Sequence, residues 1–183
     1  SGTGGAVISS NSSTASGSYS LAMASNSCTA DGEYSVAMGE YTQSRSLRGS
    51  FTQGMQRTTA GDTQSRRVVL GRNSTTDTFV SLTADGLADS ATDTIQIPEN
   101  SCMSLKAVVV GVLADGSKVA RYTVEALVKR YSSTTTIVWS SVTADHEDDA
   151  TWDCQIIVYS LGATIQAKGA SGENVRWQAT VET

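Results

Sequence analysis

The segment 144–150 contains the densest group of side chains that can take part in chemistry. It includes Asp145, His146, Glu147 and Asp148, and His146 is the only histidine of the 183 residues. Oxygen ligands suit calcium, but calcium loops place them on alternate residues around a glycine, and this run has no glycine. We therefore interpret the segment as a solvated loop that can contact a receptor, and we expect no metal ion and no cofactor.

A catalytic group is not evident in the sequence. A serine–histidine–acid triad would have to use His146, and serines are so frequent that their proximity in sequence is uninformative. Paired carboxylates can hydrolyse glycosidic bonds, but enzymes of that kind tend to use long β-helices with grooves, and this chain has only a short roll and a sandwich. These observations predict that the chain is not an enzyme.

Aromatic rings are the other candidates, because an exposed ring can stack on a sugar. Trp152 and Trp177 each lie on an alternating apolar face, which indicates core packing. The strand that holds Trp139 is flanked by Ser and Thr, and Tyr131 follows a long strand pattern. We therefore expect Trp139 and Tyr131 to be exposed and available to a ligand.

A repeat of fifteen residues organises the N-terminal part of the chain. The segment 19–24, Tyr-Ser-Leu-Ala-Met-Ala, returns at 34–39 as Tyr-Ser-Val-Ala-Met-Gly. The period predicts about four turns of a solenoid over residues 1–56, with glycine at the corners for its positive φ. Such small side chains cannot offset an ordering entropy of about 1–2 kcal/mol per residue. The repeat therefore predicts an oligomer in which Leu21, Val36, Phe51 or the methionines face identical copies.

The remainder of the chain has the pattern of an antiparallel β-protein. Residues 57–77 change character, and short apolar runs then alternate with turn signals such as Asp115-Gly116, which predicts a hairpin. Eight or nine such strands suggest a sandwich or jelly roll. We expect strands near 66–72, 78–83, 93–98, 104–114, 118–130, 134–140, 152–160, 163–168 and 174–182.

The charge distribution excludes two kinds of partner. The net charge is −5, and the basic residues form only two short clusters, at 65–67 and 129–130. A nucleic acid would need a basic stripe, so we expect no nucleic-acid partner. No stretch approaches the roughly 20 apolar residues of a membrane span, so we expect no membrane insertion.

The repeat motif Ala-x-Gly-x-x-Ser-x-Ala-x-Gly at 30–39 resembles the head repeat of trimeric autotransporter adhesins, which is also common in phage tail fibres and spikes. The resemblance covers residues 1–56 and implies a left-handed parallel β-roll with three chains side by side. It departs from the pattern at Ala24, where glycine is usual. It also departs in the last turn, where Leu47 and Thr52 replace the corner glycine and an alanine.

The C-terminal part, from "GDTQSRRVVLGRNSTTDT" to "NVRWQATVET", is similar to a C-terminal module of phage tail fibres. This resemblance implies the distal part of a trimeric viral fibre, whose role is recognition of the host. Bacterial adhesins normally end in a membrane anchor, and nothing in this sequence resembles one. The resemblance therefore favours a phage protein over a piece of an adhesin.

Together these patterns predict an all-β homotrimer with a short left-handed parallel β-roll at 1–60 and an antiparallel, jelly-roll-like β-sandwich at 61–183. The expected function is the non-enzymatic receptor-binding tip of a bacteriophage tail fibre or spike, located in the virion and extracellular. Its partners would be a bacterial surface glycan or outer-membrane receptor, and the remainder of the fibre upstream of Ser1. The alternatives are a structural trimerisation cap, an adhesin head fragment and a depolymerase fragment. Receptor contacts are expected in the loops 131–135, 141–151 and 169–174 and at Tyr131, Trp139, Asp145, His146, Glu147 and Asp148.

Overall fold

The computed structural model describes residues 2–183 apart from 10–11, 25, 56–62 and 91–92. Within these ranges every regular element is a β-strand, which confirms the predicted all-β class. The chain divides into two compact units, Ser1–Val68 and Val69–Thr183. Each unit is described by itself below.

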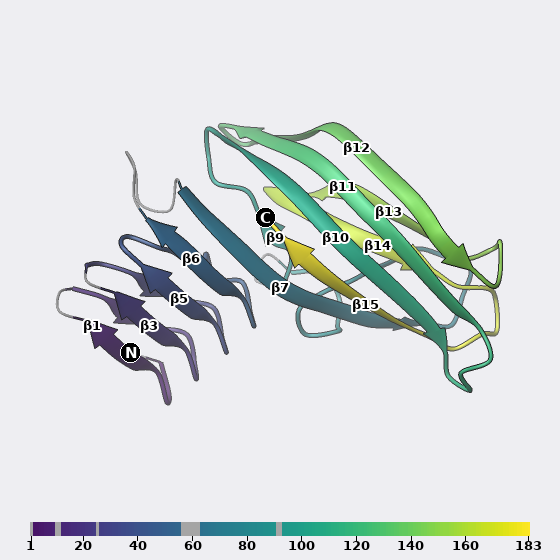
Figure 1. Ribbon diagram of the computed structural model, residues 1–183, viewed down its shortest axis with the longest axis horizontal. Coiled ribbons are helices and arrows are strands. Elements are labelled where there is room, and N and C mark those ends of the chain that lie inside the picture. The colour runs from purple at the N-terminus through teal and green to yellow at the C-terminus, as the bar shows by residue number, and fades with distance from the viewer. Residues whose placement is uncertain (1, 10–11, 25, 56–62, 91–92) are drawn as a thin grey trace. The chain divides into compact units, whose positions relative to one another are not determined.

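The first unit is a parallel β-solenoid of about three turns, where the sequence predicted about four. Its strands are stacked in register, each residue pairing with the residue fifteen positions further along: Ala6 with Leu21, Leu21 with Val36, and Val36 with Phe51. The predicted period is therefore the length of one turn (Figure 1). The strands of this face are β1 (Ala6–Ser9), β3 (Leu21–Ala24), β5 (Val36–Gly39) and β6 (Phe51–Met55), and a second face pairs β2 (Thr14–Ala15) with β4 (Thr29–Ala30).

The interior of the solenoid is filled by small side chains. A buried cluster contains Ala22, Ala37 and Cys28, and all three side chains are fully buried. The buried hydroxyls of Ser20 and Ser35 donate hydrogen bonds to the carbonyl oxygens of residues 17 and 32, at 2.6 and 2.7 Å. Each turn therefore satisfies its own corner carbonyl, and the core is held largely by backbone ladders and hydroxyl bonds.

Glycine is needed at the corners for a different reason from the one that the sequence predicted. Gly17 and Gly32 do not adopt positive φ; that conformation falls on Tyr19 and Tyr34, at 54° each. A Cβ on Gly32 would lie 2.3 Å from the carbonyl oxygen of Leu47, and one on Gly17 would lie 2.1 Å from that of Gly32. Glycine is required here because successive turns approach each other too closely for any side chain.

The outer face of β1, β3, β5 and β6 exposes a ladder of larger apolar residues. Ala22, Ala37 and Thr52 point inward, so their neighbours in the alternation point outward. Phe51 is 42% exposed, and Leu21 and Val36 are half-buried. This is the face that the predicted trimer would cover, and the trimer stays a prediction.

The second unit is built from two antiparallel sheets. In the larger one the order is β7-β15-β10-β11-β12. In the smaller one β14 pairs with β13, β8 and β9. The strands are β7 (Thr63–Ser74, which begins in the first unit), β8 (Val80–Ser81), β9 (Ile95–Gln96), β10 (Ser101–Leu113), β11 (Val119–Tyr131), β12 (Thr134–Glu147), β13 (Asp153–Tyr159), β14 (Gly162–Lys168) and β15 (Val175–Glu182).

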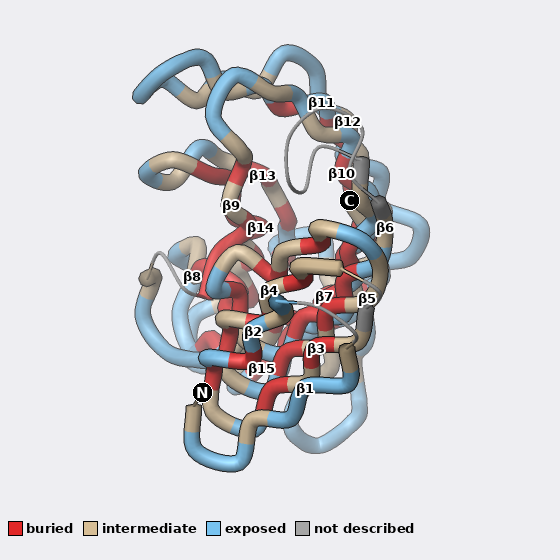
Figure 2. Tube along the Cα trace, turned by 90° about the vertical axis from the view of Figure 1, so that its left-hand side faces the viewer, coloured by how far each residue is buried: buried red, intermediate tan, exposed pale blue. Residues whose placement is uncertain are grey.

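The core of this unit contains large aromatic side chains. Trp152 and Trp177 are 2% and 3% exposed, and their rings meet edge to face with centroids 5.4 Å apart. Buried and exposed residues alternate along β11 and β15, as the sequence predicted. The strand β14 is largely buried (Figure 2). The Asp115-Gly116 turn also joins β10 to β11 as predicted, with Gly116 at a φ of 77°. The jelly-roll sandwich stays a prediction.

The end of β12 was predicted wrongly. The sequence placed a loop over 144–150, whereas β12 continues to Glu147 and pairs His146 with Arg121 and Glu147 with Ala120. The strand lies at the edge of its sheet, and most of its residues are exposed. The polar residues at the end of β12 therefore belong to a strand with both faces exposed to water. Such a strand shows no alternation of apolar and polar residues, so the sequence pattern does not predict it.

Candidate binding pocket

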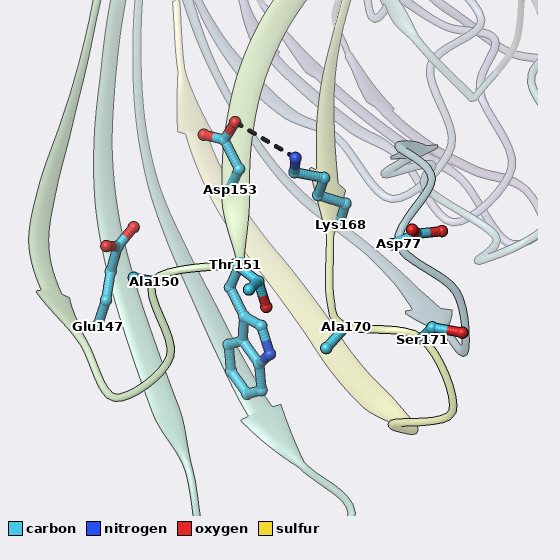
Figure 3. A pocket seen from close by; sticks show the side chains of 9 residues that line it. Asp77, Glu147, Ala150, Thr151, Asp153, Lys168, Ala170 and Ser171 are labelled. Carbon is cyan, nitrogen blue, oxygen red and sulfur yellow. Dashed lines mark ion pairs between the residues drawn. The ribbon is translucent and has the colours of Figure 1, made fainter.

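The second unit contains a pocket of about 570 Å³. It lies where the end of β12, the turn before β13, the end of β14 and the turn before β15 come together (Figure 3). Segments that are distant in the sequence therefore build one hollow. Its lining consists of Asp77, Glu147, Ala150, Thr151, Trp152, Asp153, Lys168, Ala170 and Ser171.

The pocket has a predominantly acidic lining. Asp77, Glu147 and Asp153 supply three carboxylates, against the single ammonium group of Lys168. Lys168 Nζ lies 3.9 Å from an Asp153 oxygen and 5.1 Å from the centre of the Phe79 ring. Because the ion pair is long and partly exposed, both groups remain available to a ligand. Carboxylates only accept hydrogen bonds, so this lining suits a ligand that is rich in hydroxyl donors.

One wall of the pocket is a turn held by a network of charged groups. Asp149 accepts hydrogen bonds from the Thr151 amide and hydroxyl at 3.0 and 2.7 Å, and Lys118 Nζ lies 2.7 Å from its other oxygen. Lys118 also pairs with Glu173, which accepts a hydrogen bond from Trp152 Nε1 at 2.9 Å. These bonds, led by that of Lys118, hold the pKa of Asp149 well below its usual value. The turn is therefore fixed before any ligand binds.

A buried tyrosine lies beside the acidic side of the pocket. Tyr122 is 1% exposed and packs at a tilt against Trp177, with ring centroids 6.2 Å apart. Burial, followed by the adjacent Glu147 carboxylate, raises the pKa of the Tyr122 hydroxyl well above its ordinary value. The phenol therefore stays protonated.

Among the four acidic-segment candidates, only Glu147 lines the pocket. Asp145 accepts hydrogen bonds from Arg121 and from Thr123, both at 2.7 Å. His146 Nε2 lies 3.1 Å from Asp148, and Asp148 also accepts a bond from the backbone amide of residue 119. Asp145, His146 and Asp148 thus join the edge of β12 to β11 and to the turn that follows it.

The two aromatic candidates lie elsewhere on the unit. Tyr131 and Trp139 are 76% and 53% exposed, as predicted. Tyr131 pairs with Thr134 at the hairpin that begins β12, whereas Glu147 is at the opposite end of that strand. The structure therefore does not bring the aromatic and acidic candidates into one site.

Sequence reasoning missed Asp77, Asp153 and Lys168 as lining residues. Two of the three loops expected to bind, 141–151 and 169–174, do meet at the pocket. The composition of those loops was therefore an informative signal. Asp77 and Lys168 had no such signal, because single charged residues beside strand ends are common and their meeting depends on the fold.

Two features that would point to other functions are absent from the described part of the chain. No three His, Cys, Asp or Glu side chains lie together there in a way that could hold a metal ion. No helix among those residues is long and apolar enough to cross a membrane.

Three of the solved structures that are similar to this chain are phage tailspike proteins. A tailspike protein gp49 from Acinetobacter baumannii bacteriophage Fri1, described as a capsular polysaccharide depolymerase, matches 97% of this chain and 35% of its own, with a TM-score of 0.38 and 11% identity. The tailspike of Acinetobacter phage vB_ApiP_P1 matches 92% of this chain and 41% of its own, with a TM-score of 0.31 and 8% identity. That of Acinetobacter baumannii phage AM24 matches 88% and 33%, with a TM-score of 0.30 and 6% identity.

The chain thus spans between about a third and two fifths of the length of these tailspikes. No known protein family and no curated protein matches the sequence. The likeness is too distant to assign a mechanism. The prediction that the chain is not an enzyme is nevertheless contradicted, because the first of these tailspikes is described as a depolymerase.

Proposed function

We propose that this chain is the receptor-binding part of a bacteriophage tail fibre or spike and that it binds carbohydrate on the bacterial surface. The observation that supports ligand binding is the pocket of about 570 Å³, whose three carboxylates and one lysine come from the ends of three strands and from one loop. The repeat motif at 30–39, which resembles fibre and adhesin repeats, supports the fibre context. The protein would act in the virion, outside the cell.

Carbohydrate is the ligand class that suits this pocket chemically. A sugar ring offers neighbouring hydroxyl donors, and Glu147 and Asp153 provide acceptors. Lys168 and Ser171 add donors for the ring and hydroxyl oxygens. A nucleic acid or another polyanion would meet an excess of negative charge, so a neutral or weakly charged glycan is the better fit.

We also propose that the working unit is a homotrimer. The outward ladder of Leu21, Val36 and Phe51 is the surface that three solenoids would share. Three identical sites on one rigid particle would raise the apparent affinity by about 10²–10⁴ over a single site. Weak binding of one sugar segment would then be enough for attachment of a virion.

The test is binding of the fluorescently labelled protein to a panel of bacteria, with and without removal of their surface polysaccharide. We expect binding that disappears on removal. The double variant Glu147→Gln, Asp153→Asn should bind about 10-fold to 100-fold more weakly, because hydrogen bonds to charged groups are worth about 1.5–3 kcal/mol. Glu99→Gln, an exposed residue outside the pocket, is the matched control and should bind normally.

Each alternative has its own outcome in this experiment. A structural trimerisation cap would bind none of the strains, and an adhesin head fragment would bind host material and no bacteria. Equal binding by the double variant and the control would show that the ligand binds outside the pocket. The exposed aromatic residues Tyr131 and Trp139 would then be the next surface to test. Release of reducing ends from the polysaccharide would show that binding is accompanied by cleavage.

A further inference from the structure

The last turn of the solenoid contains a buried guanidinium group that makes no hydrogen bond to the described residues. Arg66 on β7 is 2% exposed, and its Nε, Nη1 and Nη2 atoms have no hydrogen-bond partner in that part of the structure. Burial lowers the pKa of this group to about 10, so it remains charged at neutral pH. A buried charge without hydrogen bonds is strongly unfavourable unless a group of opposite charge accompanies it.

Two buried hydroxyl groups on or beside the neighbouring strand also lack a hydrogen-bond partner among the described residues. The antiparallel pairing of β6 with β7 places Thr52 opposite Arg66. The flanking residues on both strands are exposed, so Thr52 and Arg66 both point into the solenoid. Ser50 and Thr52 are 1% and 0% exposed, and both hydroxyl oxygens also have no hydrogen-bond partner among the described residues. Hydrogen-bond donors from three residues therefore face the same interior space.

The charges around Arg66 do not neutralise it through direct contact. Arg45 acts on it as a like charge, and Asp31 is the carboxylate that acts on it as an opposite charge. The Asp31 oxygens already accept bonds from the Ser44 hydroxyl at 2.6 Å and from the Ser46 amide and hydroxyl at 2.8 and 2.9 Å. The space beside Arg66 thus contains a positive charge and two hydroxyl groups, and none of the described carboxylates forms an ion pair with the guanidinium.

We propose that the solenoid binds a small monovalent anion, chloride in its chemistry, between Arg66, Thr52 and Ser50. A water molecule could accept some of these bonds, but it would leave the guanidinium charge uncompensated next to Arg45. A small ion fits better than a carboxylate or phosphate, because the solenoid interior is packed by side chains such as Ala37 and Leu47. The anion joins β6 to β7 from inside and closes the end of the repeat array. This site is independent of the carbohydrate pocket.

Bromide is the direct probe for this site. Crystals of the full chain grown or soaked in sodium bromide should show an anomalous difference peak within hydrogen-bond distance of Arg66 and Thr52. Density without an anomalous signal would mean that only water occupies the space, and the proposal would be overturned. The measurement needs no variant, so it does not depend on whether altered chains fold.

The thermal unfolding midpoint provides the second test. At constant ionic strength, replacing gluconate by chloride should raise the midpoint of the first unit by a few degrees, since the ion binds only the folded state. Thr52→Val keeps the shape and removes one donor, so the chloride effect should shrink. Arg66→Met should abolish the effect, while Arg67→Met, the exposed neighbour on the opposite face, should keep it. A bromide peak with no effect of chloride on stability would identify an adventitious ion only and would also overturn the proposal.

Discussion

The two units of this protein solve the problem of burial in opposite ways. The solenoid pairs each strand with the one fifteen residues away and fills its interior with side chains such as Ala22 and Ala37. The C-terminal unit buries Trp152 and Trp177 and joins distant segments, as in the 2.9 Å hydrogen bond from Trp177 Nε1 to the Ser74 hydroxyl. The first unit therefore depends on close backbone approach, and the second depends on large apolar side chains.

This difference determines where each unit is sensitive to change. In the solenoid, space is so limited that adding one methyl group is expected to matter more than removing one. In the C-terminal unit, removing a large ring leaves a cavity that the surrounding sheets can only partly refill. The solenoid also exposes an outer ladder at Phe51 and buries the charge of Arg66 without a hydrogen-bond partner among the described residues.

The largest expected effect is the loss of a core ring in the C-terminal unit. Trp177→Ala should destabilise that unit by about 3–5 kcal/mol, because the ring packs on Trp152 and Tyr122 and closely against Gly111. Trp139→Ala, which removes a ring that is 53% exposed, should change stability by less than about 0.5 kcal/mol. Denaturant unfolding followed by tryptophan fluorescence and circular dichroism measures both. Similar losses in the two variants would show that the unit does not depend on this core.

The second effect concerns the close approach of turns in the solenoid. Gly32→Ala places a Cβ 2.3 Å from the Leu47 carbonyl oxygen and should cost about 1–3 kcal/mol through overpacking. Gly49→Ala is the control, since Gly49 has a positive φ of 62° and its Cβ would meet no described atom within 4 Å. It should cost only about 1 kcal/mol, from backbone strain alone. Denaturant unfolding of the first unit measures both, and a smaller loss for Gly32→Ala than for Gly49→Ala would refute steric contact as the reason for the corner glycines.

The smallest effect is a pH dependence that belongs to the pocket wall. The pKa values of Asp149 and Glu173 are lowered in the folded protein, chiefly by Lys118. Their contribution to stability is therefore present above the unfolded value of about 4 and is lost as the pH falls through the folded values. The raised pKa of Lys118 adds a contribution that is lost only at strongly alkaline pH.

Thermal unfolding of the C-terminal unit should accordingly fall in midpoint between about pH 5 and pH 2. Lys118→Met should lower the midpoint at pH 7 and make the acid-induced decrease shallower, because the carboxylates lose their partner. Lys106→Met is a suitable comparison, since Lys106 pairs with Glu125 on an exposed part of the sheet and does not line the pocket. If the midpoint of Lys118→Met falls with acid as steeply as that of the unaltered chain, the bonds of Lys118 to Asp149 and Glu173 do not contribute to the stability of the unit.

The local pattern of the sequence was informative wherever neighbours in the sequence decide the structure. The fifteen-residue period predicted the register of the solenoid, and the alternation around Tyr122 and Val124 predicted the buried face of β11. The exposure of Tyr131 and Trp139 and the hairpin at Asp115-Gly116 followed in the same way. These features rest on local backbone geometry and on a choice between two faces of a strand, which composition and spacing specify.

The extent of β12 was one point at which this reasoning failed. Asp145, His146 and Glu147 have the composition of a loop, yet pairing with β11 keeps them in a strand. Whether a polar segment pairs depends on a neighbouring strand with free backbone groups, and that neighbour is a product of the fold.

The all-β class, the repeat and the small interior of the solenoid could be read from the residues alone, because each depends on a short and regular spacing. The three-dimensional arrangement was needed to show that Glu147, Asp153 and Lys168 line one pocket and that Arg66 is buried opposite Thr52. Such contacts depend on strand order and on the packing of sheets, so they join residues whose separation along the chain has no fixed period. Which buried groups lack a hydrogen-bond partner and which residues line a pocket depend on what the folded chain places around them, and no local sequence pattern specifies this.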